Sequence, residues 1–151
     1  MRQEIIRLIS IVVTKVIHDM CYLEVNTLDS VDGICDYSSD DIIVKLELFG
    51  DIKRGLCIRM NNDMALKVIS KMMMRDVQEI DYIGESALCE LGNMIGGNFS
   101  TMLYVNGLTE DVTVPSYMKG DECDMFLGME MSSLPVQTVE GNLFVDVIDL
   151  L

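Results

Sequence analysis

Residues 81–107 read DYIGESALCELGNMIGGNFSTMLYVNG and predict a helix of roughly twenty residues. Successive helical residues turn by about 100°, so side chains three or four positions apart share a face. The apolar side chains of this stretch fall on one face, which is typical of a helix packed on a core. Asn106 and Gly107 supply the signal that ends a helix. The apolar face consists of Ala87, Leu88, Leu91, Ile95, Phe99 and Met102.

The opposite face of this helix is polar. Glu90 and Asn93 are three positions apart, so both side chains project from the same patch, and Ser86 lies one turn before them. An exposed glutamate and asparagine on a helix are most often only a hydrated surface, so this pair by itself assigns no function. The same face also carries Cys89, Gly97 and Ser100.

Three glycines interrupt the second half of the helix. Gly92, Gly96 and Gly97 each cost about 1 kcal/mol relative to alanine inside a helix. Two explanations remain open for Gly96 and Gly97. Either these glycines allow another backbone to approach the helix closely, as at a docking surface, or the helix ends there.

Outside this helix, the hydrophobic periodicity changes several times along the chain. Upstream it predicts a helix, a β-hairpin around Gly50 and Asp51, and a second helix that Asn61 can cap. Downstream it predicts strands separated by glycine, proline and aspartate. The upstream elements are residues 3–20, 42–49, 54–60 and 64–74, with a polar loop and an irregular strand at 26–41. The downstream strands are residues 112–117, 123–132, 135–139 and 142–150.

This order of elements predicts a single domain over residues 1–151. The fold class is α+β, with a largely antiparallel sheet and helices packed on it. Half of the residues are hydrophobic, which is enough for a sizeable core without disulfides or a structural metal.

The charge and the cysteines narrow the classes of function. With 25 acidic and 11 basic residues the formal net charge is −14, which disfavours binding to nucleic acid or to a membrane surface. Five scattered cysteines without a C-x-x-C pair indicate a reducing cytoplasm, with most of them buried. His18 is the only histidine, which excludes a Ser-His-Asp triad and a histidine-rich metal site. The apolar residues 5–17 contain Arg7 and Lys15, so we expect neither a membrane span nor a secretory signal.

The helix motif resembles a known signature. Ser86-x-x-x-Glu90-x-x-Asn93, followed after 21 residues by Pro115, is similar to the signature of the CheC/CheX/FliY phosphatases of bacterial chemotaxis. The resemblance extends over most of residues 40–120, including the run NMIGG in the helix and the Pro-x-x-x-x-Gly turn at residues 115–120. Only Glu90 has an asparagine three residues later, so the chain carries one motif, as CheX-like members do.

The resemblance implies a fold, a reaction and a partner. The fold is a two-layer α/β sandwich, and the reaction is dephosphorylation of the aspartyl-phosphate of a CheY-like response regulator. Asn93 would orient the attacking water, Glu90 would pair with the regulator's active-site lysine, and Pro115 would fix a turn beneath the helix. The protein would have no cofactor of its own, because the regulator supplies the divalent metal, Mg²⁺, and it would form a homodimer. Ser86, Cys89, Gly96 and Gly97 would contact the partner.

Two other classes of function fit the same helix. The protein could be a non-catalytic adaptor that docks a response regulator or a flagellar switch component, and Asn93 would then be dispensable. It could also be a structural, dimer-forming domain unrelated to phosphorylation. Only the phosphatase hypothesis predicts catalytic turnover of a phosphorylated regulator.

Overall fold

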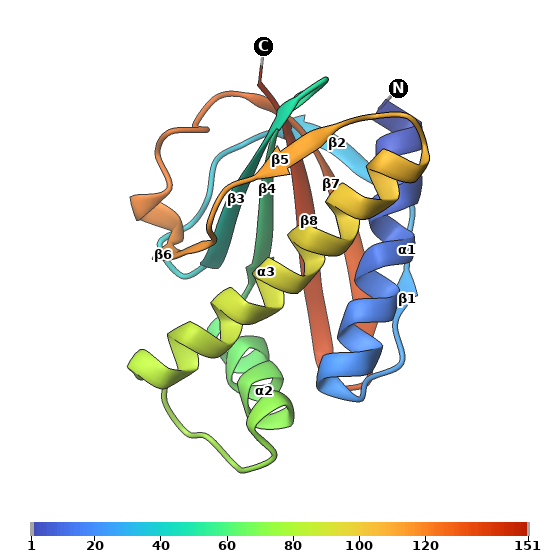
Figure 1. Cartoon of the computed structure of the whole chain (residues 1–151). Coiled ribbons are helices and arrows are strands. Elements are labelled where there is room, and N and C mark those ends of the chain that lie inside the picture. The colour runs from blue at the N-terminus through green and yellow to red at the C-terminus, as the bar shows by residue number, and fades with distance from the viewer. Residues whose placement is uncertain (1, 151) are drawn as a thin grey trace.

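A computed structural model describes residues 2–150 as one eight-stranded antiparallel sheet with three helices on one of its faces (Figure 1). The strands lie in the order β1-β7-β8-β4-β3-β5; β2 also pairs with β7, and β6 also pairs with β3. The predicted α+β class is therefore confirmed. The helices are α1 (Arg2–Cys21), α2 (Asn62–Met73) and α3 (Tyr82–Val105). The strands are β1 (Asn26–Thr27), β2 (Val31–Ile34), β3 (Ile42–Gly50), β4 (Lys53–Met60), β5 (Glu110–Val112), β6 (Ser116–Lys119), β7 (Glu130–Thr138) and β8 (Gly141–Asp149).

The main core lies between the sheet and the three helices. Strand β3 shows how the sequence builds it, because alternate side chains of a strand point to the same face. Val44, Leu46 and Leu48 are at most 1% exposed and pack toward the helices, and α3 contributes Leu91 and Ile95 to the same core. Burial of each such side chain stabilises the fold by about 1.5–3 kcal/mol. This core fixes the distance of α3 from the sheet.

A smaller core covers the opposite face of the sheet. The loop that joins β6 to β7 contains a short 3-10 helix, η1 (Gly120–Glu122), and folds back so that Phe126 packs on the strands. A Cβ on Gly55 would lie 2.7 Å from the Phe126 ring, so only glycine lets the ring pack there. Four of the five cysteines are buried, as predicted, and three of them belong to this smaller core. Those three are Cys35, Cys57 and Cys123.

A buried charge sits beside this smaller core. The Asp146 carboxylate is fully buried on β8 and accepts hydrogen bonds from Tyr37 (2.7 Å), Ser133 (2.6 Å) and Arg59 (2.9 Å). The Arg59 guanidinium lies over the Phe144 ring, 4.4 Å from its centroid. Because every partner is supplied from within the protein, the buried charge is compensated.

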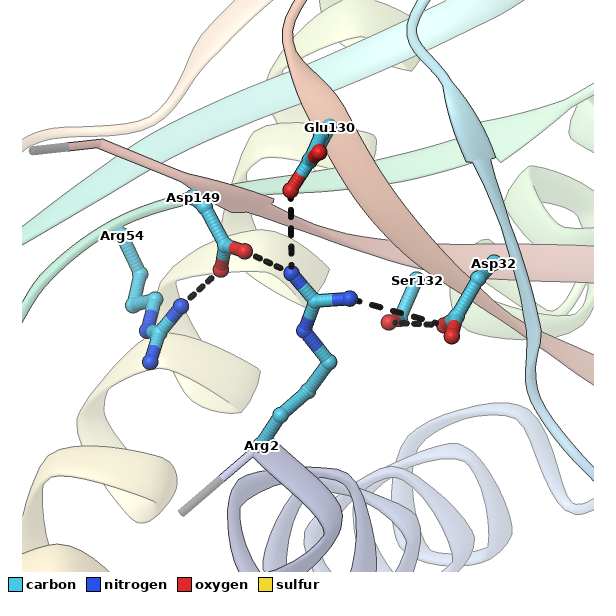
Figure 2. A network of polar contacts seen from close by, with 6 residues as sticks. All are labelled: Arg2, Asp32, Arg54, Glu130, Ser132 and Asp149. Atoms are coloured by element: carbon cyan, nitrogen blue, oxygen red, sulfur yellow. Dashed lines mark hydrogen bonds and ion pairs between the residues drawn. The ribbon is translucent and has the colours of Figure 1, made fainter.

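The two ends of the described chain meet in a polar network (Figure 2). Arg2, in the first turn of α1, pairs with Asp149 at the end of β8 and lies 3.8 Å from carboxylate oxygens of both Asp32 and Glu130. Asp149 also pairs with Arg54 of β4. The network therefore joins α1 to four strands of the sheet.

Two of the predicted strands are wrong in their bounds. Residues 123–132 were expected as a strand, but turns with hydrogen bonds from Leu127 N–H to Asp124 and from Met129 N–H to Phe126 occupy most of that segment. The strand there, β7, begins only at Glu130 and runs through Pro135. Residues 112–117 were expected as one strand but are divided between β5 and β6. Among residues 2–150, no helix combines the length and apolar character needed to cross a membrane.

Candidate functional site

Helix α3 carries the predicted site, and local sequence defines both of its ends. The Asp81 side chain caps the first turn by accepting a hydrogen bond from the Gly84 N–H at 2.8 Å. At the other end, the Asn106 N–H bonds to carbonyl oxygens of the last turn. The helix is continuous between these caps, so the interpretation that it ends at Gly96 and Gly97 is wrong.

Two glycines instead bring α3 close to the sheet. A Cβ on Gly92 would lie 2.6 Å from the Val44 side chain, and a Cβ on Gly96 would lie 2.8 Å from Leu46. The prediction that Gly96 contacts a partner is therefore wrong, because Gly96 is buried against the protein's own sheet. Gly97 is exposed, with open space around its Cβ position, and its partner contact remains a prediction.

The polar face of α3 forms one wall of a groove. Glu90 and Asn93 are both exposed, as the helical spacing predicts, and both line this groove of about 530 Å³. The opposite wall is the segment that joins β5 to β6 and the start of β6. Pro115 belongs to this wall and lies near Gly92 of the helix, and its role in fixing a turn stays a prediction. The complete lining is Tyr82, Glu85, Ser86, Cys89, Glu90, Asn93, Val114, Pro115 and Tyr117.

Three polar side chains of the groove have no bonding partner within the described part of the chain. Among residues 2–150, no hydrogen bond or ion pair involves the side chain of Glu85, Glu90 or Asn93. Helix α3 contains no basic residue, and none of the nine residues that line the groove is basic. The carboxylates and the carboxamide are therefore free to bind groups of another molecule.

Burial and a neighbouring carboxylate affect two other groups of the groove. The pKa of the Tyr117 hydroxyl is raised, first by burial and then by the nearby charges of Glu85 and Glu122. Burial also raises the pKa of the Cys89 thiol, and Glu85 contributes to that shift. Cys89 is therefore a half-buried thiol in the α3 wall of the groove, and its raised pKa makes it poorly suited to nucleophilic chemistry.

The sequence motif identified only part of this groove. Ser86, Cys89, Glu90 and Asn93 were predicted to share a face, and all of them line it. Tyr82, Glu85, Val114 and Tyr117 were not predicted. The sequence offered a clue to Glu85, which directly precedes Ser86 of the motif. The position of Tyr117, in contrast, depends on the pairing of β6 with β3. Among residues 2–150, no group of three or more His, Cys, Asp or Glu side chains is placed to hold a metal ion.

Comparison with known proteins identifies the family. The sequence model of the family described as "Chemotaxis phosphatase CheX" matches residues 42–134. The CheY-P phosphatase CheX of Thermotoga maritima is 31% identical over 80 residues, which are 52% of each chain. The chain thus spans about half the length of this curated relative.

Solved structures of low sequence identity share the fold. A chemotaxis protein CheX from Desulfovibrio desulfuricans is 19% identical, with a TM-score of 0.83 over 97% of this chain and 99% of that one. A chain in the CheX–CheY–BeF3–Mg²⁺ complex from Borrelia burgdorferi is 23% identical, with a TM-score of 0.78 over 95% and 96% of the two chains. The family match includes the Glu90–Asn93 helix and the Pro115 segment, so the resemblance is confirmed and the chain belongs to the CheX family of chemotaxis phosphatases.

Proposed function

We propose that this protein dephosphorylates the aspartyl-phosphate of a CheY-like response regulator in the cytoplasm. The observation that carries the proposal is the pair Glu90 and Asn93. They are exposed one turn apart, lack partners within the described chain and line one groove. Membership of the CheX family, and a relative named for this activity, support the same reaction.

Asn93 supplies the group that the reaction needs most. The regulator's own site stabilises the phosphoryl oxygens, so an accelerating partner has to align the attacking water. A carboxamide has one acceptor oxygen and two N–H donors, which can hold a water molecule beside the phosphorus. Asn93 does this without changing its protonation state. No covalent intermediate forms on the phosphatase.

Glu90 positions the two proteins. Its carboxylate pairs with the active-site lysine of the regulator in a charge-assisted contact, which fixes the register of α3 on the partner. Ser86, Cys89 and Gly97 lie at the edge of this contact. The divalent metal, Mg²⁺, belongs to the regulator, and the phosphatase contributes no ligand to it.

A phosphate-release assay tests the reaction. Wild-type protein should accelerate loss of radiolabelled phosphate from the regulator, whereas Asn93→Ala should reduce the accelerated rate at least a hundredfold. Asn98→Ala is the matched control, because Asn98 is another amide on α3, does not line the groove and bonds to the Met94 carbonyl at 2.7 Å. Full turnover by Asn93→Ala would refute the assigned role, and binding without turnover by the wild type would indicate an adaptor.

We also propose that the protein is a homodimer. All four residues of β2 are exposed at an edge of the sheet, and Val31 and Ile34 present apolar side chains there. An exposed apolar edge strand is a ready site for pairing with a second copy. Light scattering should give about twice the mass of one chain, and Val31→Lys should give a monomer. A monomeric wild type would refute this part of the proposal.

A further inference from the structure

The groove extends beyond the two residues used in the proposed reaction. Glu85 lies one turn before Cys89 on the same helix face and is half-buried in the wall that α3 contributes to the groove. Its carboxylate has no hydrogen-bond or ion-pair partner among residues 2–150. A half-buried carboxylate is only partly hydrated, so it gains from a cation that enters the groove.

The two acids of helix α1, in contrast, are both paired with basic residues of the same helix. On α1, Glu4 pairs with Arg7 at 2.8 Å and Asp19 pairs with Lys15 at 2.8 Å. Helix α3 has no basic residue that could play this part for Glu85. No residue that lines the groove is basic either, so among residues 2–150 the groove offers Glu85 no cation.

Two tyrosines enclose the same space. Tyr117 is half-buried in the opposite wall, and burial together with the charge of Glu85 raises the pKa of its hydroxyl. Tyr82 stands 80% exposed at the end of the groove. Aromatic faces attract ammonium and guanidinium groups, and arginine in particular stacks on them. A carboxylate that shares a groove with two aromatic rings offers a binding site for one long basic side chain.

We infer that this end of the groove binds a second basic side chain of the response regulator, separate from its active-site lysine. Glu85 neutralises the charge, and the rings of Tyr82 and Tyr117 contact the stem and head of that side chain. The inference rests on the proposed function, because it takes the regulator as the partner. It assigns to Glu85 a role in choosing the regulator and none in the chemical step.

Steady-state kinetics with a phosphorylated CheY-like regulator test this assignment. Glu85→Gln keeps the shape of the side chain and removes its charge, so KM should rise about three- to tenfold while kcat stays within twofold of the wild type. The increase in KM should shrink as salt is added. Glu79→Gln is the control, because Glu79 is an exposed acid outside the groove and should leave KM unchanged.

A double-mutant cycle identifies the basic side chain. Exposed lysines and arginines of the regulator are replaced one at a time by alanine, and binding of the BeF3⁻-loaded regulator is measured to wild-type and Glu85→Gln protein. One replacement in the regulator should weaken its binding to the wild type but should not further weaken its binding to the Glu85→Gln protein. If no replacement couples to Glu85, or if Glu85→Gln leaves KM unchanged, the inference is wrong and the proposed phosphatase activity still stands. If the wild type shows no turnover, the phosphatase proposal fails, and this binding cycle still tests the groove.

Discussion

Glu110 carries a buried carboxylate that has a hydrogen-bond partner within the described chain for only one of its two oxygens. It lies on β5, only 5% exposed, where one of its oxygens accepts a hydrogen bond from the Ile52 N–H. The other oxygen is buried and has no hydrogen-bond partner within residues 2–150. Burial raises the pKa of this carboxyl group above its ordinary value. The folded protein therefore holds the proton of Glu110 more tightly than the unfolded chain does.

This pKa shift predicts how one residue changes stability with pH. The favourable contribution of protonated Glu110 is present below the ordinary carboxyl pKa and is lost as pH rises through the higher pKa of the folded protein. At pH 7 the ionised group opposes folding, so Glu110→Gln should raise the free energy of unfolding by about 1 kcal/mol. The gain should shrink as pH falls toward about 4.5.

Urea denaturation between pH 4.5 and 7 measures this difference. Asp111→Asn is the matched control, because it removes an exposed carboxylate one residue along the same strand and should show little pH-dependent gain. A Glu110→Gln variant that is equally destabilised at both ends of the pH range would show that the carboxylate is satisfied in the fold.

At the scale of the element, the glycines of α3 have opposite roles. Gly92→Ala places a methyl group 2.6 Å from Val44, so the helix has to move away from β3, and we expect a loss of about 1–3 kcal/mol. The displacement also moves the neighbouring Asn93, so turnover should fall. Gly97→Ala meets open space and removes a helix-destabilising residue, so stability should rise by up to about 1 kcal/mol.

Thermal unfolding and the phosphate-release assay, applied to both variants, separate these roles. If Gly97→Ala is more stable but binds the regulator less tightly, the predicted partner contact at Gly97 is supported. Equal stability of the Gly92→Ala variant and the wild type would mean that α3 does not depend on this close approach.

The sequence predicted α3 well because a long apolar stripe that ends at Asn106 and Gly107 leaves few alternatives. Leu88, Leu91 and Ile95 are buried as the periodicity required. The role of Gly96 could not be read in this way, since a missing side chain looks the same in sequence whether a partner or the protein's own sheet approaches it. Its packing on Leu46 depends on a contact between residues fifty positions apart.

The strand predicted at residues 123–132 failed for a related reason. Apolar residues such as Phe126 indicated a strand, but they are apolar because the loop covers the outer face of the sheet. Local sequence patterns also could not predict that Tyr117 lines the groove, because its position depends on the pairing of Tyr117 with Val44 of a distant strand. The pairing register between distant strands therefore determines the wall of the groove opposite α3.

At the scale of the whole molecule, the Arg2 network joins the start of the described chain to its end. A positive charge in the first turn of a helix is unfavourable next to the helix dipole, and the ion pairs of Arg2 across the sheet offset this cost. Arg2→Ala should lower the free energy of unfolding by about 1–2 kcal/mol, because it leaves Asp149 with Arg54 alone and frees α1 from β2 and β7.

Arg7→Ala is the matched control for this prediction. Arg7 lies on the same helix but pairs only with exposed Glu4, so its loss should cost at most about 0.5 kcal/mol. Equal effects of the two replacements in urea denaturation would show that the network adds nothing beyond a surface ion pair.

Both walls of the groove rest on the same strand. Gly92 seats α3 on Val44 of β3, and Val44 is also the residue that pairs with Tyr117 of β6. A ligand therefore meets two walls that are both anchored to Val44, and either wall can move away only by breaking its contact with that residue. The backbone around the groove should superpose within about 1 Å between the free protein and its complex, and the entropy lost on association should come from the partner's side chains rather than from a closing lid.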